Sequence, residues 1–484
     1  MPLTPPSFTP ASPTAPANKW PGKYAWRMVT RQTQPKRGAL ERTHDFYEIY
    51  SLYDEKSVRE QASRCLQCPD PMCRTGCPLC NRIPEWLALT AEGKYLEAAA
   101  IVQATSNFPE LCSRVCPQER LCESACFLNG VSDPVSIGAI ERFIMEYAFA
   151  HGGVDTTTAP PNGRRVAVVG AGPGGLACAD ELAKSGHAVT VFEALGRAGG
   201  LLLYGIPSFK LEKDFVERRV EVLRARGIEF RFGMRLGRDL ALTKLLEDFD
   251  AVFLGIGAQL PKAIDVPGEN LIGVHQAIPF LVQTNAGIDF QGPLIEVQGR
   301  RVAVLGGGDS AMDCLRSAVR SGASDAVCLY RRDLANMPGS RKEYYNALEE
   351  GARFEFLTNP VEIVGDANGR VTGVRCVKME LGEPDASGRR KPRPVAGSET
   401  LIAADIVLGA YGFDPVPFPA GSDLARIAVN DWFAVTVDDN QMSSIPGVFA
   451  GGDLVRGANL VVNAVRDGRR AAAGIERYLR ERKG

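Results

Sequence analysis

Residues 165–194 read RVAVVGAGPGGLACADELAKSGHAVTVFEA, and this stretch decides the fold. A β-branched run opens it, and Gly170, Gly172 and Gly175 follow in G-x-G-x-x-G spacing. A helical pattern comes next, and a second β-branched run ends at Glu193. A strand, a glycine turn, a helix and a second strand that ends in an acid together form the dinucleotide-binding fingerprint.

Each residue of this fingerprint has a physical task. Gly170 permits the tight turn, Gly172 lets the backbone approach a pyrophosphate, and Gly175 lets the helix pack close to the strand. The helix N-terminus offers free N–H groups to the phosphates. Glu193 can accept hydrogen bonds from ribose hydroxyls. An ordinary glycine-rich turn would not explain both strands, the helix and the acid.

Length and composition limit the function further. The 484 residues predict about three domains, and the net charge of −1 gives no reason to expect nucleic acid or a membrane as partner. No run of 18 apolar residues occurs, and the first sixteen residues contain six prolines. We therefore expect no transmembrane helix and no signal peptide, and a disordered or draped arm over residues 1–25. Thirteen cysteines without an export signal favour a reducing, cytoplasmic location.

Nine of the thirteen cysteines lie in two groups, CLQCPDPMCRTGCPLC at 65–80 and CSRVCPQERLCESAC at 112–126. Thiolates select soft metals, and a proline directly after one crowded cysteine is typical of bacterial ferredoxins. Two cubane clusters need eight ligands, which nine cysteines can supply. Structural zinc and buried free thiols are the alternatives. The four histidines are scattered, so a histidine-based metal site is not expected.

A second fingerprint begins at residue 301, RVAVLGGGDSAMDCLRSAVRSGASDAVCLYRR. Its glycine turn has G-x-G-x-x-A spacing, and the following strand ends in two arginines instead of an acid. Guanidinium groups can bind the 2′-phosphate of NADP, which an acid would repel. A solvated basic strand end is the alternative. The predicted NADP site consists of Gly306, Gly307, Gly308, Asp309, Ser310, Ala311, Arg331 and Arg332.

A third motif, SIPGVFAGGDLVRGANLVVNAVRDGRRAA at 444–472, places Asp453 at a strand end, before a helix expected from about Asn459. An acid there can hold the ribityl hydroxyls of FAD, and the helix N-terminus can stabilise a reduced flavin. Alone, the motif would be an exposed turn. Paired with the first fingerprint, it predicts an FAD site of Gly170, Gly172, Pro173, Gly174, Gly175, Glu193, Gly200, Leu201, Gly452, Asp453, Asn459, Leu460 and Val461.

These motifs occur in an order that resembles one family. From about residue 25, the sequence is similar to the small (β) subunits of bacterial NADPH-dependent glutamate synthases, through CLQCPDPMCRTGCP, CPQERLCESAC, SIGAIERF, VVGAGPGGLACADEL, GIPSFKL, LGGGDSAMDC and FAGGDLVRGANLVVNA. The resemblance implies that NADPH reduces FAD in this chain. Electrons then pass through two [4Fe–4S] clusters to a large (α) subunit, which carries FMN and an iron–sulfur centre and makes L-glutamate from L-glutamine and 2-oxoglutarate.

The resemblance also implies an interleaved set of cluster ligands. One cluster would take Cys65, Cys68, Cys73 and Cys126. The other would take Cys77, Cys116 and Cys122, with a fourth ligand at the position of Glu141, where a related dehydrogenase has glutamine. Cys112 is the competitor for that role on spacing, and Cys80 is then no ligand.

The predicted fold class is α/β: two nested Rossmann-like domains, for FAD and NADP, of the pyridine-nucleotide oxidoreductase type, preceded by a mainly α-helical domain that binds two iron–sulfur clusters. The predicted domains are 26–155 (iron–sulfur), 156–298 and 413–484 (FAD), and 299–412 (NADP). Helical patterns are expected at 54–65, 84–107 and 137–150, with Leu96 on the core face of the second.

Hydride transfer between stacked rings needs no side-chain acid or base, so we predict no catalytic residue. A thioredoxin-reductase-like enzyme would need a cysteine pair at the flavin, which is not seen. An NAD(P)H:ferredoxin-type oxidoreductase subunit with another acceptor is the main alternative, and a scaffold with degenerate sites is a further one. The chain starts Met1-Pro2 and exposes no N-terminal cysteine, so we expect it to make no glutamate alone.

Overall fold

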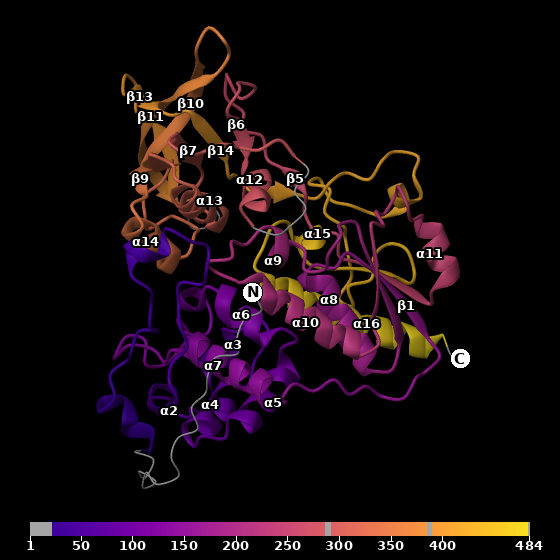
Figure 1. Ribbon diagram of the computed structural model, residues 1–484. Coiled ribbons are helices and arrows are strands. Elements are labelled where there is room, and N and C mark those ends of the chain that lie inside the picture. Colours follow the sequence, from indigo (N-terminus) through magenta and orange to yellow (C-terminus); the bar gives the residue numbers. More distant parts are fainter. Residues whose placement is uncertain (1–21, 286–291, 385–389, 483–484) are drawn as a thin grey trace.

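The computed structural model describes residues 22–285, 292–384 and 390–482 (Figure 1). Of the predicted arm at residues 1–25, residues 1–21 lie outside the described ranges, and the rest belongs to the 3-10 helix η1 (Gly22–Arg27). Within the described ranges, no helix has both the length and the apolar character needed to cross a bilayer.

The N-terminal part is helical and carries both cysteine groups. Its second α-helix begins at Glu55, directly after Asp54, whose carboxylate accepts the Ser57 N–H at 2.7 Å and so caps the helix. The helix expected over 84–107 is broken at Gly93 (φ +83°), and Leu96 is 42% exposed, so its placement in the core was wrong. After η1, the elements are α1 (Ala39–Arg42), α2 (Glu55–Ser63), α3 (Met72–Thr75), α4 (Ile83–Ala91), α5 (Tyr95–Thr105), α6 (Pro109–Val115), η2 (Gln118–Arg120) and α7 (Ile137–Ala150).

The first sheet has five parallel strands in the order β16-β4-β1-β2-β3. They are β1 (Arg165–Val169), β2 (Ala188–Glu193), β3 (Glu229–Phe232), β4 (Ala251–Leu254) and β16 (Val448–Ala450). The associated helices are α8 (Pro173–Lys184), α9 (Leu201–Tyr204), α10 (Lys213–Ala225), α11 (Leu242–Asp248), η3 (Asp423–Arg426), α15 (Asp453–Arg456) and α16 (Val461–Glu481). Because β16 pairs with β4, the chain returns to this sheet after the second one.

The second sheet repeats the arrangement, with five parallel strands in the order β6-β14-β7-β8-β9. They are β6 (Val274–Gln276), β7 (Arg301–Leu305), β8 (Asp325–Tyr330), β9 (Arg353–Phe356) and β14 (Ile406–Gly409), with helices α12 (Ala277–Thr284), α13 (Asp309–Arg320) and α14 (Arg341–Glu349). An antiparallel sheet of β10 (Thr358–Gly365), β11 (Val371–Pro384), β12 (Arg390–Pro394) and β13 (Thr400–Ala403) adjoins it.

The two parallel sheets are joined where β5 (Leu260–Pro261) pairs with β15 (Phe413–Asp414), since the chain leaves the first unit and comes back through these strands. Two parallel-stranded units of this kind, one inserted in the other, are the nested Rossmann-like arrangement that the sequence predicts. The predicted domain limits themselves stay a prediction.

Buried ion pairs fix the helical part to both units. Arg42 of α1 pairs with Glu350, just after α14, at 2.7 Å, and Figure 1 shows the indigo N-terminal segment beside α14. Arg219 of α10 binds Glu110 of α6 through two nitrogens at 2.6 and 2.7 Å. Because removal of one partner would leave a buried charge unpaired, these contacts hold the parts in one arrangement.

Candidate functional site: two nucleotide turns and two cysteine groups

The first glycine turn joins β1 to α8, and its glycines differ in what surrounds them. Gly170 has φ +103°, and a Cβ there would lie 2.4 Å from the Gly255 carbonyl oxygen. A Cβ on Gly175 would lie 1.9 Å from the Gly170 oxygen. On Gly172, by contrast, a Cβ would meet no atom within 4 Å. The turn is therefore crowded on its protein side and open at Gly172, where a pyrophosphate would approach.

Glu193 organises the same turn. Its carboxylate accepts the Ala171 N–H and the Leu195 N–H, both at 2.8 Å. Burial raises the pKa of Glu193, and these backbone donors oppose the rise. Glu193 thus lies against the turn, and each oxygen keeps acceptor capacity for a ribose hydroxyl, the role predicted for it.

The other predicted FAD residues gather at this end of the sheet. A Cβ on Gly200 would lie 2.8 Å from the Gly172 Cα atom, so the start of α9 adjoins the turn. Helices α8 and α16 lie side by side (Figure 1), and a Cβ on Gly468 would lie 2.2 Å from the Gly174 oxygen. The N-terminus of α8 follows the carboxyl end of β1, and the first turn of α16 lies beside Gly452 after β16, since a Cβ on Gly452 would lie 3.5 Å from the Ala464 Cβ.

Asp453 opens α15 directly after the Gly451–Gly452 turn. One carboxylate oxygen accepts the Asn459 N–H at 3.2 Å, and burial raises the pKa of Asp453 to about 7. Asn459 in turn accepts the Leu460 N–H at 2.8 Å, so the segment leading to Val461 is fixed. The helix expected from about Asn459 begins at Val461.

The second glycine turn, between β7 and α13, repeats the geometry of the first. Gly306 has φ +134°, and a Cβ there would lie 2.5 Å from the Ala410 oxygen, while Gly308 has no atom within 4 Å of its Cβ position. Ala311 is fully buried at the place of the third glycine. Asp309 accepts the Ser340 N–H at 2.9 Å. Both turns thus fit a dinucleotide at the same position.

The two arginines after β8 have different surroundings. Arg331 is exposed, whereas Arg332 is buried and donates from Nε to the Arg390 carbonyl oxygen at 2.9 Å. Arg331 is therefore the more accessible group for a 2′-phosphate, and Arg332 also supports the strand end. The sequence alone could not separate these two roles.

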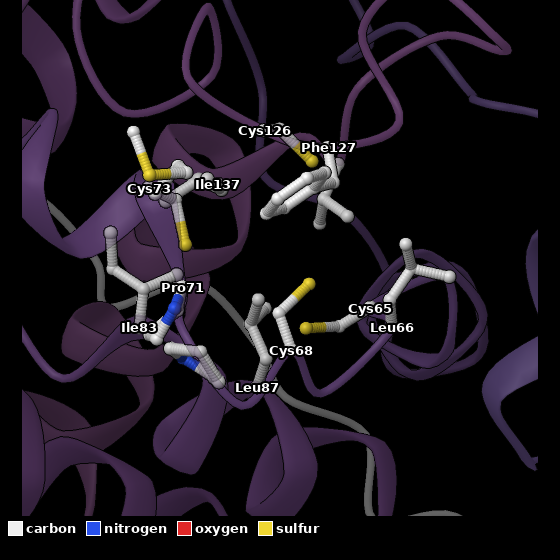
Figure 2. Close-up of a pocket in the computed structure, with 13 residues that line it drawn as sticks. Cys65, Leu66, Cys68, Pro71, Cys73, Ile83, Leu87, Cys126, Phe127 and Ile137 are labelled. Atoms are coloured by element: carbon white, nitrogen blue, oxygen red, sulfur yellow. The ribbon is translucent and has the colours of Figure 1, made fainter.

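The four cysteines predicted to bind one cluster border one cavity. Cys65, Cys68, Cys73 and Cys126 line it together with apolar side chains, and its empty volume is about 360 Å³, part of it open solvent. Figure 2 shows the four sulfur atoms around the same space. Burial raises the pKa of Cys65 and of Cys73 to about 12. No set of three or more His, Cys, Asp or Glu side chains in the described ranges is arranged to hold a single metal ion.

Gly76 explains why cysteines from two segments meet here. A Cβ on Gly76 would lie 2.7 Å from the Ala125 Cβ and 3.0 Å from the Leu121 oxygen. The end of α3 therefore touches the segment 121–125, which brings Cys73 beside Cys126. Four thiols from two chain segments around an apolar cavity suit a [4Fe–4S] cluster, which cysteine thiolates hold.

The residues predicted for the other cluster, Cys77, Cys116 and Cys122 with Glu141, influence one another. Burial raises the pKa of Cys77 to about 11 and that of Cys122 well above its usual value, and the charge of Glu141 adds to both shifts. Asn81 donates to the Glu141 carboxylate at 3.2 Å, and burial raises the pKa of Glu141 to about 8.

Both candidates for the fourth ligand adjoin this group. The pKa of Cys116 is raised well above its usual value, mainly by a hydrogen bond with Cys112. Burial and the charges of Cys112, Cys77 and Glu141 raise it further. Glu141 is a hard oxygen donor and Cys112 a soft sulfur donor, and sulfur is the usual ligand of such clusters. Cys80, by contrast, is exposed.

Sequence reasoning missed some supporting residues. Asp467 is fully buried in its side chain, accepts the Gly452 N–H at 3.3 Å and pairs with Arg456. It therefore fixes the glycine turn before Asp453. The sequence could have indicated that Asp467 is buried, because it lies one helical turn from Ala464 and Ala471, which are both buried.

The chain matches known families over most of its length. Residues 42–153 match the family described as dihydropyrimidine dehydrogenase domain II, 4Fe-4S cluster, and residues 164–468 match pyridine nucleotide-disulphide oxidoreductases. The solved structure of Mycobacterium tuberculosis FprA in complex with NADPH has a TM-score of 0.57 and 22% identity, and the match covers 67% of this chain and 86% of that one. This likeness concerns the fold.

Two curated relatives are much closer in sequence. The glutamate synthase (NADPH) small chain of Escherichia coli is 45% identical over 465 residues, which cover 94% of this chain and 98% of that protein. The putative oxidoreductase AegA of Escherichia coli is 44% identical over 94% of this chain and 71% of its own length.

The fold and the family matches define the class as a pyridine nucleotide oxidoreductase preceded by a 4Fe-4S domain. Within that class, the chain belongs to the family of NADPH-dependent glutamate synthase small chains.

Proposed function

We propose that this chain is the electron-input subunit of a glutamate synthase and oxidises NADPH. The observation that carries the proposal is the combination, in one chain, of two dinucleotide turns and two cysteine groups, with 45% identity to a small chain over nearly the whole length. FAD, when bound, takes a hydride from NADPH and releases single electrons, which [4Fe–4S] clusters can carry.

The chain's own residues hold these groups. The open positions at Gly172 and Gly308 and the N-termini of α8 and α13 receive the FAD and NADPH pyrophosphates. Glu193 and Asp453 orient the FAD hydroxyls, and Arg331, supported by Arg332, receives the 2′-phosphate. The complete FAD and NADP sets are those predicted above.

The ligand assignment is part of the proposal. Cys65, Cys68, Cys73 and Cys126 hold one cluster, and Cys77, Cys116 and Cys122 hold a second one together with Glu141. Glu141→Gln and Cys112→Ser test the last ligand. A changed EPR spectrum of one cluster in E141Q, with a wild-type spectrum in C112S, supports Glu141, and the reverse result assigns Cys112.

The acceptor is a large subunit that carries FMN and an iron–sulfur centre and makes L-glutamate, in the cytoplasm. The test is anaerobic reconstitution. The purified chain should reduce an artificial acceptor with NADPH but form glutamate from glutamine and 2-oxoglutarate only with the large subunit present. Glutamate formation by the chain alone, or no NADPH oxidation at all, would contradict the proposal.

A second candidate is an NAD(P)H:ferredoxin-type oxidoreductase subunit with another acceptor. It is favoured by the 44% identity to AegA, named a putative oxidoreductase. Affinity purification from the native host separates the two, because the first requires co-purification of a large glutamate synthase subunit and the second requires another redox partner.

A further inference from the structure

The short helix η2 of the cysteine-bearing part touches the second nucleotide turn. Arg120 donates to the Pro338 carbonyl oxygen, and its Nη2 lies 3.6 Å from Asp309 Oδ2. Beside it, the Ser340 hydroxyl donates to Glu119 Oε1 at 2.6 Å. These contacts span more than 180 positions of sequence and join the loop between Cys116 and Cys122 to the start of α13.

The segment 338–340 is in turn fixed to the glycine turn. The Gly339 N–H donates to the Gly307 oxygen and the Ser340 N–H to Asp309 Oδ1, both at 2.9 Å. A residue bound to this segment is therefore held near the N-terminus of α13. That end of the helix is where a dinucleotide pyrophosphate binds, and the space at Gly308 is open.

Asp309 creates an electrostatic problem at this place. A carboxylate in the first turn stabilises a helix N-terminus, but it repels the two negative charges of a pyrophosphate. Arg120 supplies the compensating charge from a different part of the chain. Its side chain is 40% exposed, and a guanidinium has five N–H donors, so donors remain after the contacts with Pro338 and Asp309.

We propose that Arg120 is an NADPH-binding residue: it neutralises Asp309 and donates to the pyrophosphate, and it thereby ties nucleotide occupancy to the loop that carries Cys116 and Cys122. The inference rests on the proposed function, because it takes the second turn as the NADP site. The proposed role of Arg120 differs from that of Arg331, because the pyrophosphate is common to NADPH and NADH, whereas only NADPH carries the 2′-phosphate.

The test is calorimetric titration of NADP⁺ and NAD⁺ into the FAD- and iron-loaded protein. Arg120→Gln should weaken the binding of both nucleotides by a similar factor of about ten, since a charged hydrogen bond is lost. Arg120→Lys, which keeps the charge, should recover part of the loss. Arg82→Gln is the matched control, because Arg82 is a partly exposed arginine of the same part with a local partner, Glu85, at 3.2 Å.

A second variant separates binding from a structural defect. In R120Q, the further change Asp309→Asn should recover affinity at least about threefold, because the uncompensated carboxylate is removed. A steady-state comparison of R120Q should show a raised KM for NADPH with kcat nearly unchanged. NADP⁺ should alter the EPR spectrum of a reduced cluster in the wild type and not in R120Q.

Binding of NADP⁺ by R120Q within twofold of the wild type would overturn the inference, as would no recovery in the D309N double variant. Failure of the wild type itself to bind NADP⁺ would instead overturn the proposed function, so the two failures can be distinguished.

Discussion

The nucleotide turns are formed by main chain, whereas the cysteine groups are formed by side chains. At Gly172 and Gly308 the space for a ligand exists in the folded polypeptide, bounded by carbonyl oxygens and helix N-termini. Around Cys65 and Cys73, burial raises the pKa of the thiols and so opposes the thiolate form that a cluster requires. On the proposed assignment, the nucleotide sites are formed before the ligand binds, whereas the cluster sites are completed by the ligand.

The largest effect that would test this difference concerns Gly172. Its φ is −79°, which alanine adopts freely, and a Cβ there meets no protein atom, so Gly172→Ala should fold normally. The Cβ would occupy the proposed place of the FAD pyrophosphate and weaken FAD binding by about 100-fold, or about 2.7 kcal/mol. Flavin absorbance of the purified protein measures this.

Gly308→Ala (φ −86°) is the matched variant in the second turn and should lose NADPH while keeping FAD. Gly175→Ala is the opposite control, since its Cβ would lie 1.9 Å from the Gly170 oxygen and should destabilise the fold. Wild-type flavin content in G172A would show that the open space is not the FAD site.

The cysteine groups provide the next test. Cys68→Ser removes one thiol from the cavity that Cys65, Cys73 and Cys126 also line, and it should lower iron and sulfide by about half, because one of the two proposed clusters is lost. Cys80→Ser is the control, since Cys80 is exposed and outside both proposed ligand sets. Equal iron losses in the two variants, or none in C68S, would contradict the assignment. FAD content should stay the same in both.

A smaller effect concerns nucleotide choice. Arg331→Ala with Arg332→Ala should raise the KM for NADPH about tenfold or more and leave that for NADH nearly unchanged, since a charged hydrogen bond contributes about 1.5–3 kcal/mol. The single change Arg331→Ala should account for most of the loss, because Arg332 also binds the Arg390 carbonyl oxygen. Equal KM changes for NADPH and NADH would contradict the proposal that Arg331 and Arg332 bind the 2′-phosphate.

The smallest effect concerns pH. Burial raises the pKa of Asp453 to about 7 from 3.8. The folded, FAD-free protein therefore keeps a proton between about pH 4 and 7 that the unfolded chain has released, so stability falls as pH rises through this window. Asp453→Asn should reduce that loss by about 1–2 kcal/mol. Denaturant unfolding at pH 5 and pH 8 measures it, and an identical pH dependence in D453N would contradict the shift.

The difference between the nucleotide turns and the cysteine groups also explains which features the sequence could predict. The roles of Gly170, Gly172 and Gly175 follow from local spacing, because a glycine turn between a strand and a helix is set by nearby residues. The meeting of Cys73 with Cys126 depends on the contact of Gly76 with residues 121–125, which no local pattern contains. The ligand set therefore had to come from a resemblance.

The contacts between the cysteine-bearing part and the nucleotide-binding units could not be predicted from the sequence either. Arg120 reaches Asp309 across the junction of two parts, and Arg331 and Arg332 differ in burial although they are neighbours in sequence. Both features depend on tertiary packing, which periodicity and motifs do not encode. The break at Gly93, by contrast, was available in the sequence as a glycine within a helical pattern.

An anaerobic NADPH titration of the wild type and of Gly172→Ala, followed by EPR, tests the central claim most directly. In the wild type, NADPH should produce the signal of a reduced [4Fe–4S] cluster. In G172A freed of its weakly bound FAD, with iron content unchanged, NADPH should produce no such signal, because the electrons enter through FAD. A reduced-cluster signal in flavin-free G172A, or zinc in place of iron in the wild type, would contradict the account.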